Sequence, residues 1–140
     1  MKKRNVLAIV LVTVFMLVSM AVVASGNKET DYSDPATLKK LIAEQREEYV
    51  LVDVRTKDEY ESGFIPTAIN IPYDTIANNL PTEDRSALIV VYCRSGRRSA
   101  IAQSALKELG YDNVVDFGGI DRWNWELEIP KSAAPVGAGA

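Results

Sequence analysis

The chain has 140 residues, of which 47% are hydrophobic and 25% are charged; its formal net charge is −3 and it contains no histidine. This composition is typical of a globular domain with a hydrophobic core, and the acidic balance argues against nucleic acid as a partner. The absence of histidine also excludes any mechanism that needs an imidazole as acid or base.

Residues 1–24 have the features of an export segment. Lys2, Lys3 and Arg4 precede an almost wholly apolar run of 19 residues, 6–24, which ends in small residues typical of a signal-peptide cleavage site. About 18 or more apolar residues can span a bilayer, so the segment is also long enough to remain as a membrane anchor. In both cases the positive-inside rule predicts that the rest of the chain is periplasmic or otherwise extracytoplasmic. Without the leader, the formal net charge becomes −6.

The remaining sequence predicts a linker at 25–32, one domain at 33–130 and a disordered tail at 131–140. The domain begins with a helix, because the capping side chains of Ser33 and Asp34 precede a proline that suits the first helical turn. The tail consists mainly of small residues, which offer little apolar surface to bury.

Strands and helices are predicted to alternate through this domain. After the first helix we expect a strand at 49–54, a short helix at 57–62, a short strand at 68–71, a helical turn at 73–80, a strand at 88–92, a helix at 99–110, a strand at 113–117 and a short final helix. Alternation in this order predicts a three-layer α/β domain with a largely parallel central sheet flanked by helices.

Large side chains of the later helices are expected to anchor them to the core. In the helix at 99–110, Ile101, Ala105 and Leu109 recur at the spacing of one helical face, which predicts that this face packs against the sheet. The final helix is expected to carry Trp123 and Trp125, and both are predicted to be core residues.

The stretch Cys-Arg-Ser-Gly-Arg-Arg-Ser, residues 93–99, follows the apolar run at 88–92. Five apolar residues without polar alternation suit a strand buried on both faces, and open α/β sheets bind ligands at the carboxyl ends of such strands. Gly96 allows a tight turn with inward-pointing amides, and the next helix offers its N-terminus to an anion. Three arginines lie within five residues of Cys93. Cations and helix N-termini lower a cysteine's pKa, so the loop predicts a reactive thiolate rather than a buried structural cysteine.

The candidate site residues come mainly from this loop. Cys93 is the predicted nucleophile, and the residues expected to bind an anionic substrate are Arg94, Ser95, Gly96, Arg97, Arg98 and Ser99. Asp53 and Arg55, at the carboxyl end of another predicted strand, are expected to support the scaffold. We expect Asp53 to bond loop amides and Arg55 to pair with Asp58 or Glu59. Cys93 is the only cysteine, so no internal disulfide can form.

Three further motifs accompany the cysteine loop: Leu-Val-Asp-Val-Arg at 51–55, Gly-Phe-Ile-Pro at 63–66 with Ala-Ile-Asn-Ile-Pro at 68–72, and Gly-Gly-Ile-Asp-Arg-Trp at 118–123. Together, and in this order, the four motifs resemble the landmarks of the rhodanese family of thiosulfate sulfurtransferases. The resemblance covers about residues 33–130. The chain departs from the family pattern at Phe64, where histidine is usual, and at Thr67, where glycine is usual.

The resemblance implies the rhodanese fold and a sulfurtransferase reaction. The Cys93 thiolate would attack the outer sulfur of thiosulfate, sulfite would leave, and the persulfide would pass its sulfur to cyanide or a thiol. The arginines would orient the dianionic donor. No cofactor and no metal are expected. The expected partners are the small-molecule donor and acceptor, with membrane contact only through an uncleaved N-terminal segment, and the protein is expected to be a monomer.

Two other functions stay open at this point. The domain could be a persulfide carrier or interaction module with little turnover, which the sequence does not distinguish from an enzyme. A cysteine-dependent phosphatase or arsenate reductase on the same fold ranks third, because such phosphatases resemble a Cys-x5-Arg loop with arginine six places after the cysteine. That place is Ser99 here. The shorter ring of amides suits a sulfur anion better than a phosphate with its three equatorial oxygens.

Overall fold

A four-stranded parallel sheet forms the centre of the domain. The structure is a computed structural model that describes residues 30–45 and 48–131. Its strands are β1 (Tyr49–Asp53), β2 (Ile69–Asn70), β3 (Leu88–Cys93) and β4 (Val114–Gly119). They lie in the order β2-β1-β3-β4, and every neighbouring pair is parallel. β3 is buried along its whole length, as its unbroken apolar run predicts.

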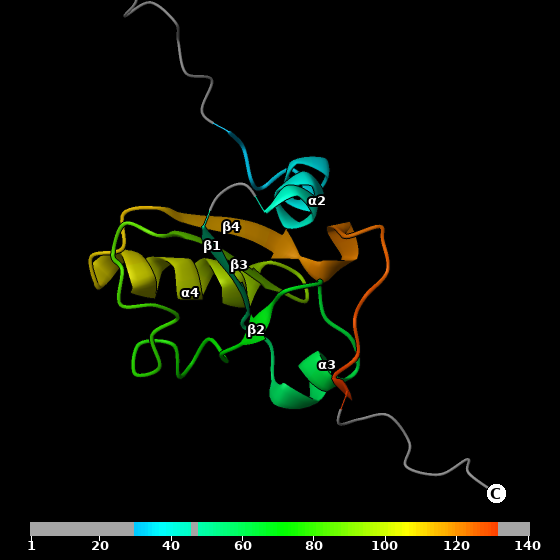
Figure 1. The fold of residues 1–140 in the computed structure, drawn as a ribbon. Coiled ribbons are helices and arrows are strands. Elements are labelled where there is room, and N and C mark those ends of the chain that lie inside the picture. The colour runs from blue at the N-terminus through cyan, green and yellow to red at the C-terminus, as the bar shows by residue number, and fades with distance from the viewer. Residues whose placement is uncertain (1–29, 46–47, 132–140) are drawn as a thin grey trace, which may run out of the picture. The chain divides into compact units, whose positions relative to one another are not determined.

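Helices cover both faces of this sheet (Figure 1). They are α2 (Pro35–Glu44), α3 (Lys57–Glu61), α4 (Arg97–Glu108) and the 3-10 helix η1 (Ile120–Arg122). Leu41 of α2 packs in one hydrophobic cluster with Val90 of β3, whereas Leu106 of α4 packs in a second cluster with Val91. Successive residues of β3 thus face opposite helices, because side chains alternate along a strand. The predicted three-layer α/β architecture is confirmed.

The first helix begins where its capping residues predict. Asp34 is the N-cap, and its carboxylate accepts a hydrogen bond of 2.9 Å from the backbone N–H of Thr37. Pro35 occupies the first turn, where a missing N–H costs nothing. Gln45 ends the helix in a left-handed conformation, with φ of 47°. Local sequence signals therefore set the start of α2, whereas no glycine or asparagine marks its end.

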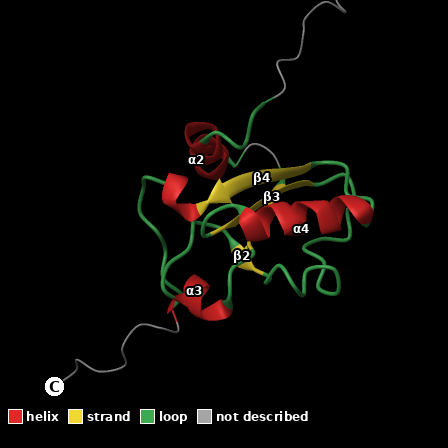
Figure 2. Ribbon diagram, turned by 180° about the vertical axis from the view of Figure 1, so that it is seen from behind, coloured by secondary structure: helices red, strands yellow, loops and turns green. Residues whose placement is uncertain are grey.

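The packed face of α4 differs from the predicted one. Ser99 and Ala102 are fully buried, whereas Ile101 and Leu109 are 43% and 41% exposed, and Ala105 is half-buried. The prediction of a packed face at Ile101, Ala105 and Leu109 is therefore wrong. The face of α4 that meets the sheet instead carries Ser99, Ala102 and Leu106, and the last two pack in the core cluster with Val91. Figure 2 shows α4 lying against β3 and β4.

Two predicted helical segments have other conformations. Residues 73–79 form consecutive turns, although the amide of Asn79 does bond the carbonyl of Thr75. The final helix is the single turn η1, and both tryptophans follow it rather than lying in it. Trp123 is nevertheless a core residue, and Trp125 packs edge-on against it with ring centroids 4.9 Å apart. Their predicted anchoring role is confirmed.

A buried ion pair closes the carboxyl end of β1. The Arg55 guanidinium donates to Asp53 at 2.7 Å and to the carbonyl oxygen of Gly63 at 2.7 Å. Asp53 also accepts the backbone N–H of Arg55 at 2.9 Å, and it is fully buried. The expected pairing of Arg55 with Asp58 or Glu59 is therefore wrong, because its nearest carboxylate lies only two residues away.

The predicted leader at 1–24 lies outside the described residues, as do most of the predicted linker at 25–32 and of the tail at 131–140. Within residues 30–45 and 48–131, none of the helices combines the length and the hydropathy of a transmembrane span. The described residues form the sheet, the helices that cover it and the segments that connect them.

Replacing Arg55 by Met should lower the free energy of unfolding by about 3–5 kcal/mol, because it leaves the buried Asp53 carboxylate without its counter-ion. Urea denaturation measures the loss. The matched control is Lys57→Met, whose side chain is 78% exposed and which should change stability by less than about 0.5 kcal/mol. Equal stability of the two variants would contradict a structural role for the Asp53–Arg55 pair.

Candidate active site

The cysteine loop lies at the carboxyl end of the central strand. Cys93 is the last residue of β3, and Gly96 is the N-cap of α4 with φ of 99°. A non-glycine residue rarely adopts that angle, so Gly96 allows the chain to turn from strand into helix within three residues. Cys93 is 1% exposed and therefore lies at the bottom of the loop. The predicted strand–loop–helix arrangement is confirmed.

Hydrogen bonds from the loop converge on the sulfur of Cys93. The backbone N–H of Gly96 donates to Sγ at 3.0 Å, and Ser99 Oγ lies 3.6 Å from it. Burial by itself raises the pKa of the thiol, but the Ser99 hydroxyl and the amides of Ser99, Gly96 and Ser95 outweigh it and lower that pKa below its usual value. The hydrogen bonds of the loop therefore stabilise the thiolate form of Cys93 relative to the thiol.

Ser99 also ties the loop to the neighbouring strand. Its hydroxyl lies 3.0 Å from the carbonyl oxygen of Gly96 and 3.4 Å from that of Gly118, at the end of β4. The Ser99 hydroxyl can donate to only one acceptor at a time. Its oxygen nevertheless lies within 3.6 Å of three groups: the Cys93 sulfur and the carbonyl oxygens of Gly96 and Gly118. Ser99 was predicted as a substrate ligand, and the structure places it beneath the loop, fully buried.

The loop packs directly on the glycine pair that ends β4. A Cβ atom at Gly119 would lie 2.7 Å from the carbonyl oxygen of Arg94 and 3.1 Å from Cα of Ser95. A Cβ at Gly96 would approach Cα of Gly118 to 3.6 Å. Any side chain at Gly119 would therefore push the loop outward, so this glycine sets how closely the loop approaches the sheet.

The three arginines of the loop do not share one role. Arg94 and Arg97 are exposed. Arg98 instead donates two hydrogen bonds, of 2.7 and 2.9 Å, to the carboxylate of Glu59 on α3. All three arginines were expected to bind the anionic substrate. The structure instead pairs Arg98 with a carboxylate of α3.

Glu59 was one of two carboxylates expected to pair with Arg55, and its actual partner, Arg98, was not predicted from the sequence. It belongs to a capping box, in which the Thr56 hydroxyl accepts from the Glu59 amide while the Glu59 carboxylate accepts from the Thr56 amide. The pattern Thr-x-x-Glu at 56–59 signals that box, but not the arginine partner 39 residues away. The hydrogen bond from Arg98 is the largest cause of a lowered Glu59 pKa, about 2.

The departure from the family pattern at Phe64 has a structural explanation. Phe64 is 8% exposed and stacks on Tyr60 with ring centroids 4.2 Å apart. Its backbone forms a bridge to Glu128 through hydrogen bonds of 2.9 and 2.8 Å. The side chain at this place therefore contributes apolar packing between α3 and the core.

Replacing Glu59 by Gln should lower the free energy of unfolding by about 1 kcal/mol at neutral pH, because it removes a partly shielded two-bond ion pair. The Glu59 pKa is lower in the folded state than its usual 4.5, so the pair stabilises fully above about pH 4.5. That contribution is lost as the pH falls toward about 2. Urea denaturation of wild type and variant across this range should therefore give a difference that shrinks with acidity.

The control for this experiment is Glu61→Gln. Glu61 pairs with Lys57 at 3.6 Å across an exposed helical turn, so its removal should change stability little at any pH. A difference between wild type and Glu59→Gln that stays constant across the pH range would show that the charge of Glu59 does not act through Arg98.

Known proteins match this chain over the region that holds the site. A family model described as Rhodanese-like domain matches residues 34–126. A sulfurtransferase of Allochromatium vinosum is 36% identical over 91 residues, 64% of this chain and 84% of its own length. Thiosulfate sulfurtransferase PspE of Escherichia coli is 35% identical over 82 residues, 57% of this chain and 75% of its own.

A solved structure of a rhodanese-like domain is also similar to this chain. A rhodanese-like domain protein from Staphylococcus aureus is 38% identical, with a TM-score of 0.59 over 68% of this chain and 93% of that chain. The chain spans less of some longer relatives: it is 38% identical to an adenylyltransferase and sulfurtransferase of Ogataea parapolymorpha over 90 residues, 62% of this chain but 23% of that protein. Because the matched residues include the sheet, α4 and the cysteine loop, the chain belongs to the rhodanese-like domain family.

Proposed function

We propose that the protein is a sulfurtransferase that moves sulfane sulfur from thiosulfate, or a similar donor, through a persulfide on Cys93. The observation that carries this proposal is the bond of 3.0 Å from the Gly96 amide to Cys93 Sγ, at the N-terminus of α4. Such a position stabilises sulfur as an anion. Relatives named as sulfurtransferases support the same reaction class.

The proposed reaction has two displacement steps. In the first, the Cys93 thiolate attacks the outer sulfur of thiosulfate; the sulfur–sulfur bond of the donor breaks, and sulfite leaves with the electron pair. In the second, cyanide attacks the terminal sulfur of the persulfide and leaves as thiocyanate, and Cys93 returns to its thiolate form. A thiolate acceptor would instead take the sulfur as its own persulfide. Neither step needs a proton from the protein, which suits a chain without histidine.

The loop supplies the electrostatic stabilisation that these steps need. Backbone amides at the helix N-terminus would hold the terminal sulfur as an anion, and the exposed guanidiniums of Arg94 and Arg97 would bind the dianionic donor above it. We assign Arg98 a positioning role, because its hydrogen bonds go to Glu59. The supporting roles of Asp53 and Arg55 are likewise structural, at the carboxyl end of β1.

A persulfide carrier with little turnover would use the same cysteine. The two functions differ in steady-state kinetics: an enzyme turns over thiosulfate with cyanide or a dithiol many times per site, whereas a carrier stops after one sulfur. Assays of the full-length chain with each acceptor separate them. The shorter loop, with Ser99 in place of the arginine of a Cys-x5-Arg phosphatase, disfavours phosphate chemistry.

We also propose that the domain acts outside the cytoplasm. This rests on the three positive charges and the apolar run of residues 1–24. The segment would act as a cleaved signal peptide or as a retained anchor. Cell fractionation followed by N-terminal sequencing would decide between the two, and recovery of the intact chain in the cytosol would refute export.

Incubation with thiosulfate should add one sulfur atom per chain, on Cys93, and cyanide should remove it. The stoichiometry cannot exceed one, because Cys93 is the only cysteine and no second thiol is present to discharge the persulfide as an internal disulfide. Intact-mass spectrometry measures the gain. Cys93→Ser is the control and should neither gain sulfur nor turn over thiosulfate. An unchanged wild-type mass, or a gain that persists in Cys93→Ser, would overturn the covalent mechanism.

Replacing Arg94 or Arg97 by Ala should raise the KM for thiosulfate roughly 10- to 100-fold, the effect of losing one charge-assisted contact worth about 1.5–3 kcal/mol. Steady-state kinetics with cyanide as acceptor measure the change. Lys107→Ala, an exposed basic residue in the last turn of α4, is the charge-matched control. Unaltered KM values in both arginine variants would mean that the loop is not the donor site.

A further inference from the structure

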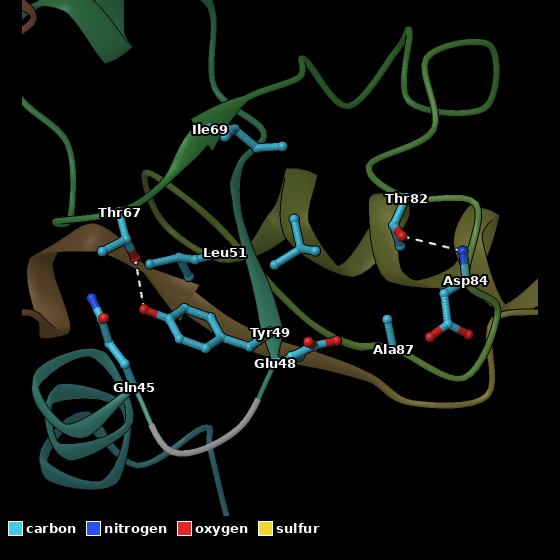
Figure 3. Close-up of a pocket in the computed structure, with 10 residues that line it drawn as sticks. Gln45, Glu48, Tyr49, Leu51, Thr67, Ile69, Thr82, Asp84 and Ala87 are labelled. Atoms are coloured by element: carbon cyan, nitrogen blue, oxygen red, sulfur yellow. Dashed lines mark hydrogen bonds between the residues drawn. The ribbon is translucent and has the colours of Figure 1, made fainter.

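A groove of about 540 Å³ lies on the edge of the sheet, around the first residues of β1 and remote in sequence from the cysteine loop. Its lining residues are Gln45, Glu48, Tyr49, Val50, Leu51, Thr67, Ile69, Thr82, Asp84 and Ala87. Figure 3 shows β1 running through the middle of the groove, with Tyr49 and Thr67 on one side and Asp84 and Ala87 on the other. The floor of the groove is therefore the edge of a strand.

That edge is open along half of the strand. β1 pairs with β3 over all five of its residues, from Tyr49 to Asp53, but β2 pairs only with Val52 and Asp53. Asp53 directs its carbonyl toward the β2 side, where it accepts the amide of Ile71. Because backbone groups alternate in direction along a strand, Tyr49 and Leu51 direct theirs to the same side, and the parallel pairing of Val52 with Ile69 engages only the carbonyl of Leu51. Among the described residues, no strand lies opposite Tyr49.

The conformation of Thr67 explains why β2 stops short. Thr67 has φ of 72° and follows Pro66 in a turn closed by the hydrogen bond from the Ala68 amide to the Ile65 carbonyl. A residue with positive φ cannot continue an extended strand. The Thr67 hydroxyl lies 3.0 Å from that of Tyr49, which fixes the turn beside the open edge. The groove is thus held open by a turn of the chain itself.

The charged residues of the groove are both acidic. Glu48 directly precedes β1 and is exposed, and Asp84 lines the same groove. The hydroxyl and the amide of Ser86 donate to Asp84 at 2.7 and 2.9 Å, and these bonds hold the Asp84 pKa below its usual value. Within residues 30–45 and 48–131, the groove is lined by no lysine and no arginine. Its charge is therefore complementary to a cationic side chain.

We propose that this groove docks an extended segment of a partner protein that carries lysine or arginine, added as a strand beside Tyr49, Val50 and Leu51. An open strand edge supplies main-chain donors and acceptors to such a segment, and its two walls receive alternate side chains. The segment would place a basic side chain between Glu48 and Asp84. This docking is separate from sulfur transfer, and it uses none of the residues of the cysteine loop.

The test uses the ¹⁵N-labelled full-length chain in mild detergent and a blocked hexapeptide, Thr-Lys-Val-Lys-Val-Thr. Titration should shift the amide resonances of Tyr49, Val50 and Leu51 in a saturable way, with smaller shifts at Cys93. Two further probes separate the causes: the same peptide with Glu for each Lys tests charge, and a version with N-methylated central amides tests strand addition. Both of these probes should bind at least about fivefold more weakly than the unmodified lysine peptide.

The matched variants keep the fold and change only the position of the charge. Glu48→Gln with Asp84→Asn should weaken binding of the lysine peptide roughly fivefold, the effect of two exposed charge pairs. Glu83→Gln with Glu108→Gln removes the same net charge from residues outside the groove and should leave binding unchanged. Thiosulfate turnover should be the same in both double variants, because no residue of the cysteine loop is altered.

Several results would overturn the proposal. Equal affinity of the two double variants, or of the lysine and glutamate peptides, would remove the charge argument. Full binding of the N-methylated peptide, or of lysine amide alone, would mean that a small cation occupies the groove. If dilution of the protein without peptide moves the same three amides and sedimentation shows dimers, the occupant is a second copy of this chain. Absence of any shift with the lysine peptide would reject docking at this edge.

Discussion

The site depends on the contact between the cysteine loop and the glycine pair at the end of β4. No side chain fits at Gly119, whose Cβ would lie 2.7 Å from the carbonyl oxygen of Arg94. Since the loop rests on backbone, its amides are held at a fixed height above the sheet, and Gly96 can donate to the Cys93 sulfur. A larger residue at Gly119 would displace Arg94 and Ser95, and Ser95 is one of the residues whose amides stabilise the Cys93 thiolate.

Two different sets of forces then act on the thiolate. Burial opposes ionisation of Cys93, and short-range hydrogen bonds from the loop reverse that effect. The arginines act at longer range, and they divide into two groups: Arg94 and Arg97 are exposed, whereas Arg98 bonds Glu59. The hydrogen bonds therefore surround the sulfur, and in the proposed reaction the exposed guanidiniums of Arg94 and Arg97 would bind the donor.

The Arg98–Glu59 pair also connects two structural segments. Glu59 caps α3 through Thr56, while Arg98 lies in the first turn of α4, directly beside the cysteine loop. The pair thus joins the α3 segment, which buries no side chain fully, to the helix whose N-terminus faces the sulfur. At the opposite end of β1, the turn at Thr67 leaves the sheet edge open. One domain therefore presents the cysteine loop and an uncovered strand edge at separate places.

The sequence by itself determined the local features of this protein. The apolar run at 88–92, the capping residues Asp34 and Pro35, and the glycine in the cysteine loop predicted the strand, the helix start and the tight turn, because each depends on neighbouring residues only. The order of these elements was enough to predict the parallel α/β fold, and the four motifs were enough to indicate the family.

Only the tertiary structure decided which face of α4 packs and which partner each charge takes. Ile101 and Leu109 have the apolar spacing of a packed face, yet Ala102 and Leu106 are the residues of α4 that pack against the sheet. Arg98 meets a carboxylate 39 residues away, and this pairing depends on where α3 lies. Local patterns record propensity and periodicity, whereas the rotation of a helix and the pairing of distant side chains are set by packing between elements.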